Sequence, residues 1–152
     1  MITIAPAEIV TFTLEYLESR FGIDSSVFSK AKFYLGSRSR LYMINESVEV
    51  AQFAVTAGLL VARVPRFVKP STNFLQAFES SITKSKLQLD KTQAQKYISG
   101  EDLTLDSNTE ETPENGYVAV FYGAYCLGCG FLKNSVLKNV LPKEKRLNLK
   151  FL

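Results

Sequence analysis

The segment from residue 6 to residue 20 carries apolar residues at helical spacing. They recur every three or four positions, at Ile9, Phe12, Tyr16 and Leu17. Such a stripe is typical of a helix that buries one face. Pro6 suits a first helical position, and Gly22 is a common stop signal. We therefore expect a helix over residues 6–20.

Three short apolar runs further along have the character of strands. Residues 33–35 and 41–44 predict two strands, and the polar link 36–40 between them favours a hairpin. Residues 59–64, LLVARV, predict a strand that is buried on both faces.

Two further helices are expected in the first half. Residues 47–57 are interpreted as a helix with Asn45 or Ser47 as its cap. Ser71 is expected to cap a second helix that continues to about Phe78.

The second half combines short strands with one helix. Strands are expected over residues 86–89, 103–105 and 117–122, and a helix over residues 92–98. Residues 106–116 contain no apolar side chain and predict a long exposed loop.

Glycines interleave with apolar side chains from Tyr125 to Phe131, which favours a kinked or bulged strand in a small barrel. We therefore expect an α+β protein. An N-terminal α/β unit would span residues 1–80, and a mainly β domain would span residues 81–152.

The amino-acid composition limits the kinds of catalytic and metal site that the chain can form. The chain has 152 residues, of which 46% are hydrophobic and 22% charged, as in globular proteins. The absence of histidine removes the commonest general base and metal ligand. Cys126 and Cys129 form one C-x-x-C, but a structural zinc site needs four ligands. We see no signal peptide and no run long enough to span a membrane, so a cytoplasmic protein without metal or cofactor is expected.

Charge is distributed in blocks. Residues 30–86 carry nine basic and three acidic side chains, and residues 117–152 carry six basic and one acidic. Residues 87–116, between them, carry seven acidic and two basic side chains. Solvated faces are one explanation, and a polyanionic partner for the basic blocks is the other.

The glycine-rich stretch resembles a known family. The string GYVAVFYGAYCLGCG, from Gly116 to Gly130, is followed by LKNVLPK at residues 137–143. Together they closely resemble the C-terminal RNA-binding region of RNA cytosine-5 methyltransferases of the Sun and RsmF type, which is a PUA-like domain. KPSTNFLQAF at residues 69–78 and YISGE at residues 97–101 also resemble these enzymes, and the resemblance extends over about residues 15–147.

The resemblance does not extend to the catalytic half. No glycine-rich loop between a strand and a helix is available for S-adenosylmethionine. The family's catalytic cysteines follow proline or threonine, whereas Cys126 follows Tyr125 and Cys129 follows Gly128. The resemblance therefore implies an RNA-binding module that is not an enzyme. The first half also resembles the leading domain of PUA-containing ribosome-assembly factors, a pre-PUA-like domain.

Basic residues are the candidate RNA contacts, because Lys and Arg neutralise backbone phosphates. The resemblance puts one set, the basic tail, beside the RNA surface of the PUA domain: Lys133, Lys138, Lys143, Lys145 and Arg146. A second set lies around the expected hairpin and two prolines: Lys30, Lys32, Arg38, Arg40, Arg63, Arg66 and Lys69. For both sets the alternative is a solvated surface.

Among the tyrosines, Tyr125 is the candidate for stacking on an unpaired base, whereas Tyr34 and Tyr122 are expected in the core. Gly128 and Gly130 permit a close approach, within the fold or by an RNA backbone.

Cys126 and Cys129 are expected to be buried small residues rather than a redox pair, because strand positions three apart face opposite sides. Five acidic residues are expected to be solvated rather than to bind a cation: Asp102, Asp106, Glu110, Glu111 and Glu114.

The resulting hypothesis is an RNA-binding accessory protein without catalytic activity. Its RNA would be rRNA or tRNA, in RNA modification or ribosome assembly. It would deliver RNA to a separate methyltransferase or shield an assembly intermediate. The alternative is a protein–protein interaction module that retains the PUA-like fold, and an enzyme of another type ranks last.

Overall fold

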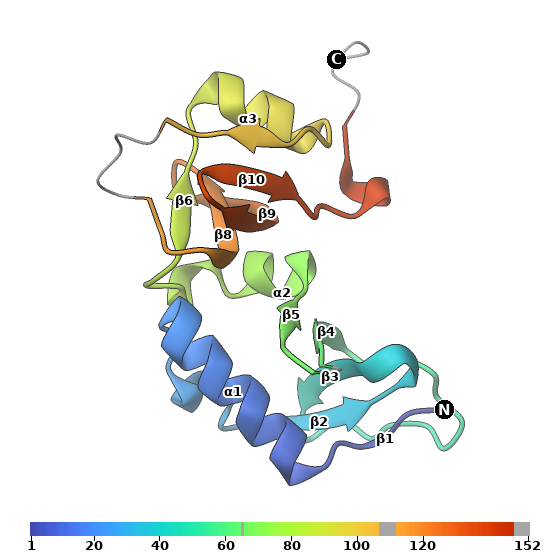
Figure 1. Ribbon diagram of the computed structural model, residues 1–152. Helices are drawn as coiled ribbons and strands as arrows, with labels where there is room; N and C mark the ends of the chain where they lie inside the picture. The colour runs from blue at the N-terminus through green and yellow to red at the C-terminus, as the bar shows by residue number, and fades with distance from the viewer. Residues whose placement is uncertain (65, 107–111, 148–152) are drawn as a thin grey trace.

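The computed structural model describes residues 1–64, 66–106 and 112–147, which form two five-stranded sheets with helices against them. Figure 1 shows the first sheet and α1 at one end of the molecule, the second sheet and α3 at the other, and α2 between them. The helices are α1 (Ala7–Phe21), α2 (Thr72–Ala77) and α3 (Lys91–Ile98). Short 3₁₀ turns lie at Ser25–Phe28 (η1), Ser37–Ser39 (η2), Glu79–Ser81 (η3) and Lys143–Lys145 (η4). The expected mixture of helices and sheets is confirmed.

The first sheet is antiparallel throughout, and its strand order follows the chain. Its strands are β1 (Thr3–Ile4), β2 (Ala31–Leu35), β3 (Arg40–Asn45), β4 (Leu59–Arg63) and β5 (Lys69–Pro70). β2 and β3 form the expected hairpin, in which Tyr34 pairs with Tyr42. The strand expected over residues 59–64 is β4, an interior strand between β3 and β5.

Helix α1 begins after Pro6 and ends at Gly22, as the sequence predicts. Gly22 adopts a left-handed conformation with φ of 65°, which suits a residue without a side chain. The buried face is rotated from the expected stripe. Leu17 and Phe21 are fully buried, whereas Phe12 is exposed.

The helix expected over residues 47–57 is wrong, because this segment is a loop between β3 and β4. The Asn45 side chain accepts a hydrogen bond from the N–H of Ser47 at 2.9 Å, which makes a local turn instead of a helix start. The loop then runs beside β1, where the N–H of Ile2 donates to the carbonyl of Ala54 at 2.9 Å. A partner distant in the chain therefore decides its backbone conformation.

The second sheet curls into a half-barrel, with α3 against it (Figure 1). Its strands lie in the order β6 (Lys86–Gln88), β8 (Gly116–Tyr122), β9 (Tyr125–Lys133), β10 (Val136–Asn139) and β7 (Leu103–Thr104). β6 is parallel to β8, and the other neighbours are antiparallel. A capping box between Asp90 and Gln93 starts α3.

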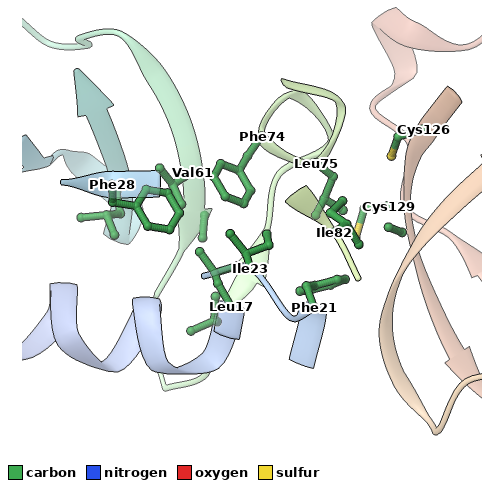
Figure 2. Packing of buried hydrophobic residues seen from close by; sticks show 14 of the residues in the cluster. Leu17, Phe21, Ile23, Phe28, Val61, Phe74, Leu75, Ile82, Cys126 and Cys129 are labelled. Carbon is green, nitrogen blue, oxygen red and sulfur yellow. The ribbon is translucent and has the colours of Figure 1, made fainter. Parts of the chain in front are cut away.

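A bulge in β9 puts Cys126 and Cys129 on the same face. Cys129 pairs with Ala119 and Cys126 with Phe121, so that Leu127 is one residue extra in this register. The expected bulge is thus confirmed, and the expectation that the two thiols face opposite sides is wrong. Both lie in one cluster of buried side chains (Figure 2).

Helix α2 joins the two halves through a shared core. Phe74 stacks on Phe28 with ring centroids 6.0 Å apart, whereas Leu75 points toward Cys129 (Figure 2). The same cluster includes Phe121 of β8, and a second cluster lies between α3 and the half-barrel. The division into domains at residues 80 and 81 stays a prediction.

Candidate nucleic-acid interface

The part of the basic tail that carries Lys143, Lys145 and Arg146 leaves β10 at Asn139, a buried polar residue. Its side-chain amide donates to the carbonyls of Tyr97 at 2.7 Å and Glu101 at 3.0 Å, and its oxygen accepts from the N–H of Leu141 at 2.9 Å. Its own N–H donates to a carboxylate oxygen of Asp102 at 2.8 Å. These bonds fix the direction of the tail along the C-terminal end of α3. Sequence reasoning did not single out Asn139, although an amide in the apolar run VLKNVL was an available signal.

Arg146 and the residue after it hold the end of the tail against the C-terminal end of α3. Its Nε donates to the carbonyl of Leu141 at 3.0 Å, and the next N–H, that of Leu147, donates to the carbonyl of Ile98 at 2.8 Å. Gly100 accommodates the side chain, because a Cβ there would lie 2.7 Å from Cδ of Arg146. Arg146 is therefore a structural residue in addition to a predicted RNA contact.

Lys145 meets two residues of the second basic set at an open pocket of about 370 Å³. Arg63 of β4 and Lys69 of β5 line this pocket with Lys145, although they are far from it in the chain. We call it the inter-half pocket. Its other lining residues are Leu60, Ser71, Thr72, Asn73, Pro142 and Glu144. The fold thus combines the two basic blocks at one site.

The charges of the first sheet are aligned across three strands. Arg40 lies directly opposite Arg63, and Arg63 lies directly opposite Lys69. Directly opposed residues project from the same face of a sheet. Leu41 and Ala62, the next pair on β3 and β4, are fully buried and fill the other face. Three cations are therefore collected on the side of the sheet away from the core.

Lys133 and Lys138 line a different hollow of about 490 Å³, on the β9–β10 hairpin. Lys133 pairs with Val136, and Lys138 pairs with Phe131. These four residues project from one face, so two ammonium groups flank an apolar pair. The structure therefore divides the predicted basic tail between two surfaces.

Three further predicted contacts are exposed: Arg38, Arg66 and Lys143. Arg38 lies within η2 at φ of 56°, which presents its side chain from a tight turn. Contact of either basic set with RNA stays a prediction.

Two tyrosines face each other at the tip of the β8–β9 hairpin. Tyr122 pairs directly with Tyr125, and their exposed fractions are 42% and 71%. Tyr125 is accessible as a stacking candidate requires. The expectation that Tyr122 lies in the core is wrong, because Tyr122 is the last residue of β8, at the exposed tip of the hairpin. Tyr34 is half-buried.

The two cysteines are buried and free, as expected for small core residues. Burial raises the pKa of the Cys126 thiol to about 12 and also raises the pKa of Cys129. Neither thiol is therefore ionised near neutral pH, which argues against a redox pair.

The acidic residues and glycines have local roles. Asp102 accepts the hydrogen bond from Asn139, whereas Glu110 and Glu111 lie outside the described residues. Gly128 and Gly130 accommodate side chains of the fold itself, since Cβ atoms there would contact Tyr97 and Leu137.

The described residues contain no helix that is long and apolar enough to cross a bilayer. Within those same ranges, no group of three His, Cys, Asp or Glu side chains has an arrangement that could hold a metal ion.

The family comparison agrees with the architecture of the second half. Residues 84–147 match the family model described as the methyltransferase RsmF PUA domain. No curated protein sequence matches the chain. The matched segment begins just before β6 and ends at Leu147, where the tail returns to α3. The resemblance detected in the sequence is thereby confirmed over residues 84–147, which are similar to the PUA domain of RsmF-type methyltransferases.

Proposed function

We propose that this chain is an RNA-binding accessory protein without catalytic activity of its own. The observation that carries the proposal is the match of residues 84–147 to a PUA domain, because PUA domains bind RNA. That domain has exposed ammonium groups at Lys133, Lys138 and Lys143. Exposed cations supply the sequence-independent part of RNA affinity.

The proposed setting is rRNA or tRNA modification or ribosome assembly in the cytoplasm. Its partner would be a separate RNA methyltransferase or an assembly factor. The family match supports the association with RNA modification. In this proposal the first half is a pre-PUA-like unit and the second half the PUA-like domain. The core shared through Phe74 and Leu75 supports joint action of the two.

A protein–protein interaction module is the second candidate. Large apolar side chains on the first half favour it, because Ile4 and Phe53 are 78% and 79% exposed. Exposed apolar patches are typical of interaction surfaces. This candidate predicts stable complexes with a protein and weak affinity for RNA.

Titration of the whole chain into fluorescently labelled RNA, followed by anisotropy at several salt concentrations, tests the proposal. We expect saturable binding that weakens steeply as salt rises, because counterions are released from the phosphates. Binding that is absent at low salt would contradict the proposed function and favour the interaction module. Crosslinking to RNA in cells, followed by sequencing, would identify the RNA.

A further inference from the structure

We infer that the inter-half pocket binds a phosphodiester group of an RNA backbone through Arg63, Lys69 and Lys145. This inference rests on the proposed function and assigns a specific binding site to one phosphate group of the RNA backbone. It goes beyond the PUA-like domain, because two of the three cations belong to the first sheet. RNA at this position would contact both halves of the molecule.

The row of charges is the first observation. Arg40, Arg63 and Lys69 are directly opposed across β3, β4 and β5. Like charges in this arrangement repel and destabilise a sheet. Within the described residues, none of the three forms an ion pair with a carboxylate. An anionic ligand would relieve this repulsion.

The placement of Lys145 is the second observation. Its Nζ lies 3.4 Å from Oε1 of Gln76, and Nε2 of Gln76 donates to the carbonyl of Leu127 at 3.0 Å. This chain of contacts holds the half-buried lysine at the pocket. Glu144 is the single carboxylate among the described lining residues. Arg63, Lys69 and Lys145 therefore leave the pocket with an excess of positive charge.

The lining chemistry indicates the part of the RNA that is bound. Ser71 and Asn73 add polar side chains, and no aromatic ring is among the described lining residues. A base would need a ring to stack on or a set of edge contacts. Cations with small polar groups instead suit phosphate oxygens, which position an RNA without reading its sequence. We therefore expect the site to tolerate any base.

The test uses the whole chain with Arg63→Gln, Lys145→Gln and the double variant. The probes are labelled oligouridine and oligoadenosine, and anisotropy gives the affinities. Each single change should weaken binding by about three- to tenfold, equally for both probes. The double change should weaken it by less than the product of the two, because both cations hold one phosphate. Lys91→Gln/Lys96→Gln, on the exposed face of α3, is the control and should bind within about twofold of the parent.

The melting temperature without RNA shows whether Arg63 serves to bind a ligand or to stabilise the fold. Arg63→Gln removes the middle charge of the row, so the melting temperature without RNA should stay the same or rise. A lowered melting temperature together with lost affinity would overturn the inference. The inference would also be overturned if each single variant bound RNA like the parent. It would be overturned as well if the affinity lost in the double variant equalled the product of the losses in the two single variants. In both of these cases the proposed function stands. If the parent itself binds no RNA, the proposed function fails, and the inference fails with it.

Discussion

The hydroxyl of Tyr97 donates a hydrogen bond to the backbone carbonyl of Cys129 at 2.6 Å. To reach this carbonyl, the tyrosine passes close to a neighbouring position of β9 that has no side chain. That position is Gly128, with φ of 156°, and a Cβ there would lie 2.7 Å from the Tyr97 hydroxyl and 2.9 Å from Leu141. The contact fastens α3 to β9. Because α3 also holds Asn139, it fixes the start of the basic tail.

Gly128→Ala should destabilise the protein. The added methyl group would meet the Tyr97 hydroxyl and the residue would keep an unfavourable φ, so we expect a loss of about 2–4 kcal/mol in the free energy of unfolding. Gly123→Ala is the matched control, because Gly123 has φ of 60° but a Cβ added there would have nothing within 4 Å. The control should lose only about 1–2 kcal/mol. Urea denaturation measures both, and equal losses would show that the close approach at Gly128 does not matter.

Asn139→Ala should loosen the tail. It removes three side-chain hydrogen bonds and leaves the partner groups unsatisfied, at a cost of about 2–4 kcal/mol. Limited proteolysis should then cleave after the residues of η4 faster than in the parent. Lys138→Ala, an exposed neighbour, should change stability by about 0.5 kcal/mol or less. A tail as resistant as the parent's would mean that the bonds of Arg146 and Leu147 are enough to hold it.

Local signals explain what the sequence could predict of the fold. Ser71 caps α2 by accepting from the N–H of Phe74 at 3.0 Å, as its position before an apolar helix indicates. The strands β2, β3 and β8 likewise follow from short apolar runs. The segment 47–57, expected as a helix, instead bonds to the backbone of Ile2, just before β1 and far away in the chain. A single sequence contains no sign of that pairing.

The candidate site was predictable in composition but not in arrangement. Arg63 and Lys145 were both expected to contact RNA, yet only the packing of α2 between the halves brings them to one pocket. The prediction that Cys126 and Cys129 face opposite sides of the strand was wrong. One extra residue in β9 reverses the alternation of side chains between the two faces. The position of Tyr122 was also wrong, because an apolar run does not reveal that its last residue lies at the exposed tip of a hairpin.

The buried thiols should make stability fall at alkaline pH. The pKa of Cys126 is about 12 in the fold, above the ordinary value of 9.0, and that of Cys129 is also raised. Below the ordinary value both states hold the proton and nothing is lost. Above it the unfolded chain releases the proton first, so the free energy of unfolding declines until the folded thiol also titrates.

For Cys126 the decline should run from about pH 9 to about pH 12, at up to about 1.4 kcal/mol per pH unit. Urea denaturation across this range, with Cys126→Ala as the comparison, measures it. The variant should show a shallower decline, although Tyr16, whose pKa is raised to about 12, contributes in the same direction. Identical slopes would mean that Cys126 ionises as readily in the fold as outside it.

The exposed lysines of the second half should set the salt dependence of RNA binding. Lys133→Ala/Lys138→Ala/Lys143→Ala removes three exposed charges without touching the core. We leave Arg146 out, because its Nε bond to Leu141 supports the tail and its loss would confuse stability with binding. Three lost phosphate contacts should shallow the slope of log affinity against log salt by about two to three units.

The loss should be similar for RNAs of different sequence, because phosphate contacts position a chain and do not read it. Lys84→Ala/Lys91→Ala/Lys96→Ala removes the same charge from exposed positions outside both basic sets and is the matched control. Anisotropy at several salt concentrations gives both slopes, and melting temperatures should change little for either variant. If both triple variants shift the slope equally, net charge alone governs binding. If neither shifts it, the phosphate contacts lie elsewhere, and the inter-half pocket becomes the main surface to test.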